Sequence, residues 1–378
     1  MNCHLIQNYF NCTSRHSTKC ASLPLSKVTS LILQNRGRAS AEPEPSQNLE
    51  QYDSSAPIKL RSRDFQLVET PGQLQDMLKA LSGAHTVAMD CEGVNLGHTG
   101  KLCLLQLAAR KSSHAGASSS GTKIPLVQGK TDALKPASTP PVIPATRSAA
   151  SAVSNTPVLK KGSQLQLFIV DIHKLQWRAF HYRLDPTDPS SLTLKSLLES
   201  SNYTKLVYDV RSDASNLLQQ FDVRLRSMYD LQLAEVAVRQ MRGVPAKWVL
   251  PLEKSLSNWL PRSSALEQDM LHGHYISKHY HQGNRMEVWQ ERPLKEELLH
   301  YAAADVRYLH LLQDVLDKIL PPPLVQKVYS ATISRIRTGN LPGLSRSSAP
   351  DIVRPSDVRQ LTEQLRQREV EKRGELQR

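Results

Sequence analysis

Apolar residues recur along the middle of the chain in patterns that predict helices and strands in a regular order. Leu74, Met77, Leu78 and Leu81 repeat at helical spacing, which predicts a helix over residues 72–82. The later elements predicted in the same way are strands over 85–90, 102–109, 165–171, 205–210 and up to Asp230, and helices near 190–200, 212–221, 231–239 and 291–320. Strands followed by alternating helices and strands predict an α/β fold.

Three segments lack this pattern. Residues 111–163 are rich in Ser, Ala, Pro, Lys and Gly, contain one acidic residue, and are predicted to be a disordered insertion in a loop between strands. Residues 1–60 are predicted to be a disordered N-terminus with a linker. Prolines 321–323 are predicted to end the long helix and to open a basic, partly helical tail over 321–378. One domain over 61–320, interrupted by the insertion, is therefore expected.

The N-terminal segment has two interpretations. Residues 1–41 contain no Asp or Glu but several Lys, Arg, Ser and Thr, which is typical of an organellar transit peptide and equally consistent with a disordered terminus. The first interpretation places the protein in a mitochondrion or chloroplast, and the second in the nucleus or cytoplasm. The five cysteines show no metal-site spacing and indicate a reducing compartment. No apolar run approaches the ~18 residues of a membrane span.

The net charge of +13 favours a polyanionic partner. Counted along the sequence, the excess of Lys and Arg lies in residues 1–60, 111–163 and 321–378, whereas the rest of the chain has as many acidic as basic residues. The predicted domain is therefore neutral, and the basic segments outside it could attract nucleic acid.

Two acids lie in the segment AMDCEG, at and just after the end of the predicted strand over 85–90. Asp90 and Glu92 are two residues apart, so on a strand both side chains point to the same face. Two carboxylates among apolar neighbours are unfavourable unless a cation binds them, and oxygen ligands suit Mg²⁺ or Mn²⁺. The pair alone is also consistent with two solvated acids at a strand end.

Further candidates lie later in the chain. Asp213 follows a predicted strand and opens a helix, although Asp209 competes with it and Asp213 could simply cap the helix. Tyr301 and Asp305 are four residues apart and share one face of the predicted 291–320 helix. The alanines at 302–304 let another element approach that face closely. An ordinary helix with an exposed acid remains the alternative.

The ordered set of these residues resembles the DEDD superfamily of 3′–5′ exonucleases. The strings MDCEG, KLCLLQLA, FDVRLRSMYDLQLA and WQERPLKEELLHYAAADVRYL support the resemblance, which covers about residues 64–320 without the insertion. They are most similar to the ribonuclease D and Werner-type branch with a tyrosine in its last motif, and to Egalitarian-like proteins with a 3′–5′ exonuclease domain. The resemblance implies a ribonuclease H-like fold, a mixed sheet flanked by helices.

The same resemblance implies a mechanism. Two Mg²⁺ or Mn²⁺ ions would be bound by Asp90, Glu92, Asp213 and Asp305, and RNA or DNA with a free 3′ end would be hydrolysed to nucleoside monophosphates. Tyr301 would orient the attacking water. The alternative is a nuclease fold that binds RNA as an adaptor, because some Egalitarian-like relatives lack the acids that are present here. The sequence does not distinguish RNA from DNA and identifies no protein partner.

The last motif contains both a histidine and a tyrosine. DEDD enzymes carry either a histidine five residues before the final Asp or a tyrosine four residues before it, and His300 and Tyr301 satisfy both spacings. On a continuous helix Tyr301 lies about 40° from Asp305, and His300 about 140° away. This phase predicts Tyr301 as the functional residue and His300 as an exposed one.

Overall fold

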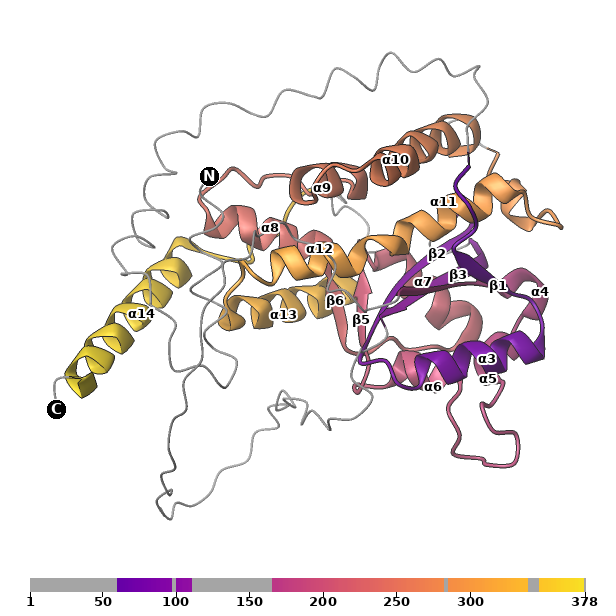
Figure 1. Ribbon diagram of the computed structural model, residues 1–378, viewed down its shortest axis with the longest axis horizontal. Coiled ribbons are helices and arrows are strands. Elements are labelled where there is room, and N and C mark those ends of the chain that lie inside the picture. The colour runs from indigo at the N-terminus through magenta and orange to yellow at the C-terminus, as the bar shows by residue number, and fades with distance from the viewer. Residues whose placement is uncertain (1–59, 97–99, 111–164, 282–284, 339–346, 377–378) are drawn as a thin grey trace, which may run out of the picture. The chain divides into compact units, whose positions relative to one another are not determined.

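A six-stranded mixed sheet forms the centre of the computed structural model, which describes residues 60–96, 100–110, 165–281, 285–338 and 347–376 (Figure 1). The strand order is β1-β4-β3-β2-β5-β6. The central strand β3 is antiparallel to β2 and β4, whereas the β1–β4, β2–β5 and β5–β6 pairs are parallel. The strands are β1 (Phe65–Val68), β2 (Thr86–Val94), β3 (Lys101–Arg110), β4 (Leu165–Asp171), β5 (Thr204–Val207) and β6 (Met228–Asp230).

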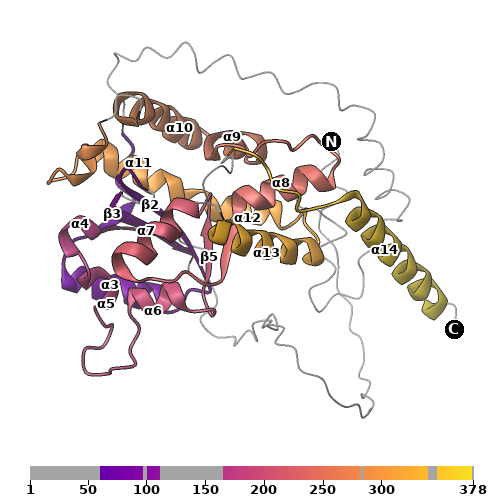
Figure 2. The same ribbon diagram turned by 180° about the vertical axis from the view of Figure 1, so that it is seen from behind.

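Helices cover both faces of this sheet. One group precedes β6 in the chain and consists of α3 (Pro71–Leu81), α4 (Ile172–Leu175), α5 (Arg178–His181), α6 (Leu194–Glu199) and α7 (Arg211–Phe221). The other group follows β6 and consists of α8 (Leu231–Met241), α9 (Leu252–Trp259), α10 (Ser264–Ile276), the π-helix η2 (Ser277–His281), the 3₁₀ helix η3 (Met286–Gln290), α11 (Glu296–Arg307), α12 (Leu309–Leu316) and α13 (Pro322–Thr338). Figures 1 and 2 show the two groups on opposite sides of the strands.

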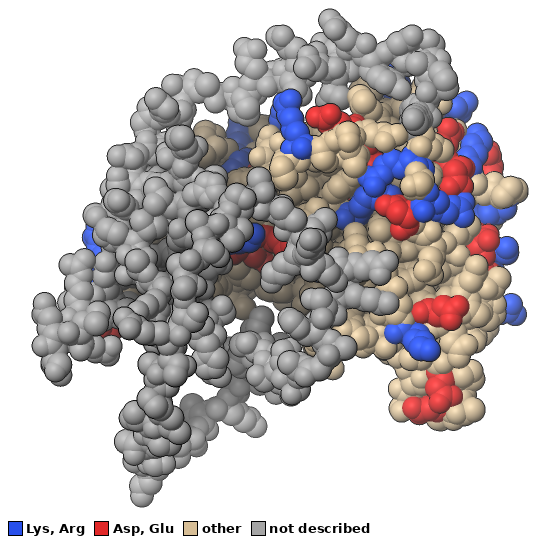
Figure 3. Space-filling model, in the orientation of Figure 1, with Lys and Arg blue, Asp and Glu red and all other residues tan. Residues whose placement is uncertain are grey.

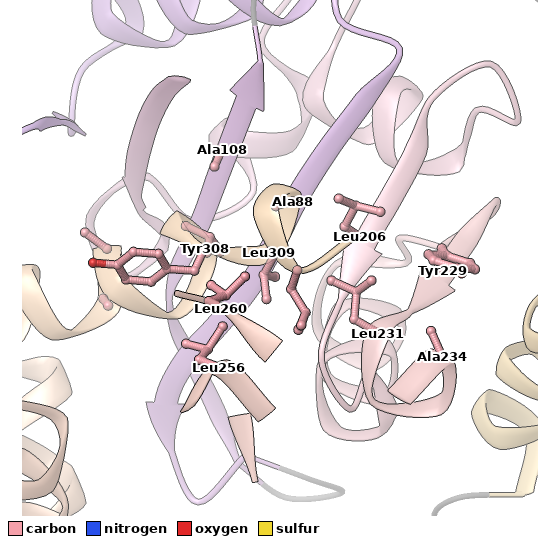
Figure 4. Packing of buried hydrophobic residues seen from close by; sticks show 14 of the residues in the cluster. Ala88, Ala108, Leu206, Tyr229, Leu231, Ala234, Leu256, Leu260, Tyr308 and Leu309 are labelled. Atoms are coloured by element: carbon pink, nitrogen blue, oxygen red, sulfur yellow. The ribbon is translucent and has the colours of Figure 1, made fainter. Parts of the chain in front are cut away.

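The two faces bury separate apolar clusters because successive strand residues point to opposite sides. Ala88, Leu104 and Ala108 pack with the later helices, whereas Met89 and Leu105 pack with the earlier ones. Figure 4 shows part of the first cluster, in which side chains from β2, β3 and β5 meet those of α8, α9 and α12. Both faces of β3 are buried, which explains why its sequence is a continuous apolar run.

Most of the predicted elements are confirmed, with three differences. The short strand β1, the four-residue helices α4 and α5, the helices α9 and α10, and the turns of η2 and η3 were not predicted. The predicted 291–320 helix begins only at Glu296, after a cis Arg292–Pro293 peptide bond, and is divided at Tyr308 into α11 and α12. The prolines at 321–323 do end it, but Pro322 also begins α13, because proline fits the first turn of a helix.

The packed region continues past residue 320, where the sequence pattern places the domain boundary. Val328 and Thr332 of α13 are fully buried, and Ile352 and Val353 pack into the same cluster before α14 (Pro355–Leu376). The predicted transit segment and insertion lie outside the described residues. Among the helices within the described ranges, none has the length and apolarity needed to cross a membrane.

Acidic and basic side chains alternate over the described part of the face in Figure 3, with no large area of one sign outside the grey atoms. This distribution agrees with the balanced charge counted for the predicted domain. The described residues that are visible on this side therefore form no broad basic surface.

Candidate active site

The first two acids lie where β2 changes its register with β3. Asp90 and Glu92 share one face of β2, and a bulge lies between Glu92 and Gly93. A side chain at Gly93 would place its Cβ 2.1 Å from the carbonyl oxygen of Lys101, so only glycine allows the two strands to meet in this way. Bulges of this kind redirect neighbouring side chains. The sequence MDCEG thus provides two carboxylates and the glycine that fixes their direction.

The third acid comes from α11, which packs across β2, β3 and β4. Ala302 and Ala303 are fully buried, and their small side chains let the helix approach the sheet closely. Carboxylate oxygens of Asp90, Glu92 and Asp305 consequently lie within 4.8 Å of one another. Residues more than 200 positions apart are therefore assembled into one carboxylate cluster, as the predicted motif requires.

The electrostatic environment of this cluster is unfavourable to its own charge. Burial, together with the charge of Asp209, raises the pKa of Asp90 to about 7. Burial also raises the pKa of Glu92 well above its ordinary value, with further contributions from Asp305, Asp90 and Asp213. The pKa of Asp305 is likewise raised, by burial and by Asp90. Such a group holds protons or a cation at neutral pH. Several carboxylate oxygens at this spacing fit a hard divalent ion such as Mg²⁺ or Mn²⁺.

Asp213 lies beside the cluster without joining it. It is buried in the first turn of α7, and its charge contributes to the raised pKa of Glu92. The helix begins after Val210, with no side-chain capping bond, so Asp213 is the third helical residue rather than the cap. The structure thus brings Asp90, Glu92 and Asp305 together and leaves Asp213 next to them.

The competing acid, Asp209, is held by arginines. Its carboxylate accepts hydrogen bonds from Arg211 at 2.5 and 2.6 Å, and Arg335 lies 3.9 Å away. Its backbone N–H donates to Asp230 at 3.1 Å, and its φ of 64° is left-handed. These interactions fix Asp209 as part of a salt-bridge network, which favours Asp213 as the fourth acid of the site.

Tyr301 and His300 face different surroundings. The pKa of Tyr301 is raised by burial and then by the charges of Asp305, Glu92 and Asp90, which places its phenol beside the carboxylate cluster. The prediction that His300 is exposed is wrong. Its ring is buried edge-on against Phe65 of β1 at 5.2 Å, and its Nε2 lies 3.3 Å from Glu296.

A hollow of about 200 Å³ opens next to Tyr301 and Asp305, and its other wall comes from helices that the sequence pattern did not predict. It is lined by Leu252, Glu253, Leu256, Leu266, Asp269, Met270, Gly273, Ser277, Tyr301, Ala304, Asp305 and Tyr308. Asp269 accepts hydrogen bonds from Tyr308 at 2.6 Å and from Arg307 at 2.9 Å, which ties α10 to α11. No motif in the α10 sequence marks Asp269, so its role in the wall emerges only from the fold.

Residues 184–321 match the family model described as 3′–5′ exonuclease. Over these residues the chain is similar to the 3′–5′ exonuclease family. The match includes Asp213, Tyr301 and Asp305, whereas Asp90 and Glu92 precede it. The similarity to the family therefore covers the later part of the fold, and β2 brings Asp90 and Glu92 next to Asp305 of that part.

Two further similarities concern known proteins. The piRNA biogenesis protein EXD1 of Bombyx mori is 25% identical over 187 residues, which span 49% of this chain and 51% of that protein. The match thus covers about half of the relative's length. A structure of the Trypanosoma brucei RNase D:GMP complex is 19% identical, with a TM-score of 0.50, and the similarity covers 75% of this chain and 69% of that chain. At this identity the likeness concerns the fold alone, which is RNase D-like.

Proposed function

We propose that the chain is a divalent-metal-dependent 3′–5′ exonuclease, which shortens nucleic acid from a free 3′ end and releases nucleoside monophosphates. The observation that carries this proposal is the cluster of Asp90, Glu92 and Asp305, whose carboxylate oxygens lie within 4.8 Å of one another in a chain that is similar to the exonuclease family. Acids at this spacing are unfavourable in a purely structural role, because Asp305 and Asp90 raise the pKa of Glu92 and Asp90 raises the pKa of Asp305.

The four acids would divide the binding of two Mg²⁺ or Mn²⁺ ions. Asp90, Glu92 and Asp305 form the common group, and Asp213 at the start of α7 would complete it from the side of Glu92. The ions, when bound, would make a nearby water more acidic and stabilise the negative charge that develops on the phosphate and the leaving oxygen. The carboxylates would hold the ions in place and would remain ionised when the ions are bound.

Tyr301 would orient the attacking water. Burial and the adjacent carboxylates raise the pKa of its phenol, so the hydroxyl keeps its proton and acts through hydrogen bonds rather than as a base. His300 has no path to this role, because its ring packs against Phe65 on the other side of α11. On this basis the site belongs to the tyrosine branch of the DEDD enzymes.

The hollow beside Asp305 would receive the terminal nucleotide. Leu252, Leu256 and Met270 form an apolar wall suited to a base or a sugar, and Tyr301 and Asp305 lie at its edge. We propose RNA as the first substrate to test, because the Bombyx mori relative is a piRNA biogenesis protein and the fold is that of an RNase D.

The experiment follows a 5′-labelled single-stranded RNA during incubation with the wild-type protein in Mg²⁺ or Mn²⁺. We expect a ladder that shortens one nucleotide at a time, and no shortening in EDTA. Asp305→Asn should lower the rate at least about 100-fold, because the cluster loses a charged ligand. The matched control is Asp76→Asn, an exposed acid on α3. Binding of intact RNA with either ion present, without any shortening, would instead assign an RNA-binding adaptor.

A further inference from the structure

Gln106, in the middle of β3, is fully buried, and its side chain makes no hydrogen bond. Neither Nε2 nor Oε1 has a partner within the described residues, although the side chain has no exposed surface. Its neighbours on the same face of β3 are Leu104 and Ala108, both apolar. A buried amide destabilises a fold when neither its nitrogen nor its oxygen makes a hydrogen bond, and such groups are rare in proteins. A leucine would suit this position better if packing were its sole role.

The register of the sheet places Gln106 beside the carboxylate cluster. Gln106 is paired directly with Asp90 on β2 and with Ile169 on β4. Directly opposite residues of an antiparallel pair point to the same face, with Cβ atoms roughly 5 Å apart. The pair two positions along the strands, Ala88 and Ala108, confirms the face, since both belong to the cluster beneath the later helices. Asp90 is thus the polar one of the two cross-strand neighbours of Gln106.

Helix α11 covers this position. Its buried residues Ala302, Ala303 and Val306 belong to the same cluster as Ala88 and Ala108, and the helix packs on β2, β3 and β4. Gln106 is therefore closed off from solvent and cannot touch a substrate in this structure. Any effect that it has on the reaction must pass through a neighbouring side chain.

We infer that Gln106 is a positioning residue for Asp90, to whose carboxylate its Nε2–H group donates a hydrogen bond when that carboxylate binds a divalent cation. The inference rests on the divalent-cation site of the proposed function. An ionised carboxylate only accepts hydrogen bonds, and an amide nitrogen only donates them, so the two groups are complementary. One oxygen of Asp90 would bind the cation while Gln106 orients the other. Removal of such supporting partners typically weakens metal affinity about 10–100-fold.

The test measures Mn²⁺ binding to the full chain by titration calorimetry, without nucleic acid. Gln106→Leu removes the amide but keeps the size of the side chain. We expect its Mn²⁺ affinity to fall about 10-fold, while its melting temperature in EDTA stays equal to that of the wild type or rises. A purely structural glutamine would give the opposite pattern, a lower melting temperature with unchanged affinity. Gln106→Met provides a second, unbranched variant if the leucine variant does not fold.

The control is Ile169→Val, which alters packing on the other side of Gln106 and should leave Mn²⁺ affinity unchanged. The inference is overturned if Gln106→Leu or Gln106→Met binds Mn²⁺ like the wild type, or if the control weakens binding equally. If the wild type itself binds no Mn²⁺, the cation site of the proposed function fails and this inference with it. Wild-type binding with unaffected Gln106 variants overturns only the role of Gln106.

Discussion

Replacement of Asp90 by asparagine should stabilise the metal-free protein while it removes function. Asp90 has an ordinary pKa of 3.8, which its surroundings in the folded protein raise to about 7. At about 1.4 kcal/mol per pKa unit, the ionised carboxylate costs about 4 kcal/mol of stability above pH 7. Asparagine keeps the shape without the charge. Since an amide recovers only part of this cost, we expect a gain of about 1–3 kcal/mol, and about 2–4 °C in melting temperature for each kcal/mol.

The sign of the pH dependence provides an internal check. Because folding raises the pKa of Asp90, the folded state binds more protons than the unfolded state between about pH 4 and pH 7. The cost is absent below the unfolded pKa and complete above the folded one. The stability difference between Asp90→Asn and the wild type should therefore be largest near pH 8 and should shrink as the pH falls below about 7.

The assay is thermal and urea unfolding in EDTA, repeated with saturating Mg²⁺ or Mn²⁺. The wild type should gain about 2.7 kcal/mol at a metal concentration 100 times its Kd, and Asp90→Asn should gain much less. The control Asp76→Asn should stay within about 0.5 kcal/mol of the wild type. A less stable Asp90→Asn protein in EDTA would refute the reasoning, because it would show that the carboxylate makes favourable interactions without a metal.

Three further outcomes are expected. Tyr301→Phe should reduce turnover about 10–100-fold with little change in stability. His300→Ala should retain turnover but lose about 1–3 kcal/mol of stability. Measurements of turnover and of urea unfolding on both variants test these two expectations. The Mn²⁺ affinity of the wild type, measured by calorimetry, should rise between pH 6 and pH 8 as Asp90 loses its proton, and a flat profile would contradict the pKa near 7. Gly93→Ala should lower the melting temperature strongly, because its Cβ meets a backbone carbonyl, whereas Gly83→Ala, with no atom within 4 Å, should change it little.

The central part of the fold was predictable because its apolar pattern is local. β3 is buried on both faces and reads as a continuous apolar run, and α3 shows its buried leucines at helical spacing. β1 has only four residues, too few for a pattern, and it is defined by its pairing with β4. The helix α13 was missed because three prolines read as a stop, although Pro322 begins the next helix.

The site was predictable where the spacing of residues within one element fixes their direction. Asp90 and Glu92 on a strand, and Tyr301 and Asp305 on a helix, needed no tertiary information. The choice between Asp209 and Asp213 did need tertiary information. Asp209 is bound by Arg211, two residues away, and also by Arg335, which comes from the distant helix α13.

The prediction that His300 is exposed failed for the same reason, because it too needed tertiary information. Helical phase correctly directs it away from Asp305, but the surface it meets there is Phe65 of the unpredicted strand β1 rather than solvent. The unbonded amide of Gln106 likewise becomes visible only when the register pairs it with Asp90.

The most direct test of the account is the release of label from a 3′-end-labelled single-stranded RNA by the wild-type protein in Mn²⁺. We predict that the label appears first as a nucleoside monophosphate, before the rest of the strand shortens, and that EDTA or Asp305→Asn stops its release. Label that remains on a bound, intact strand at saturating Mn²⁺, or that leaves on longer internal fragments, would contradict a 3′–5′ exonuclease built on the carboxylate cluster.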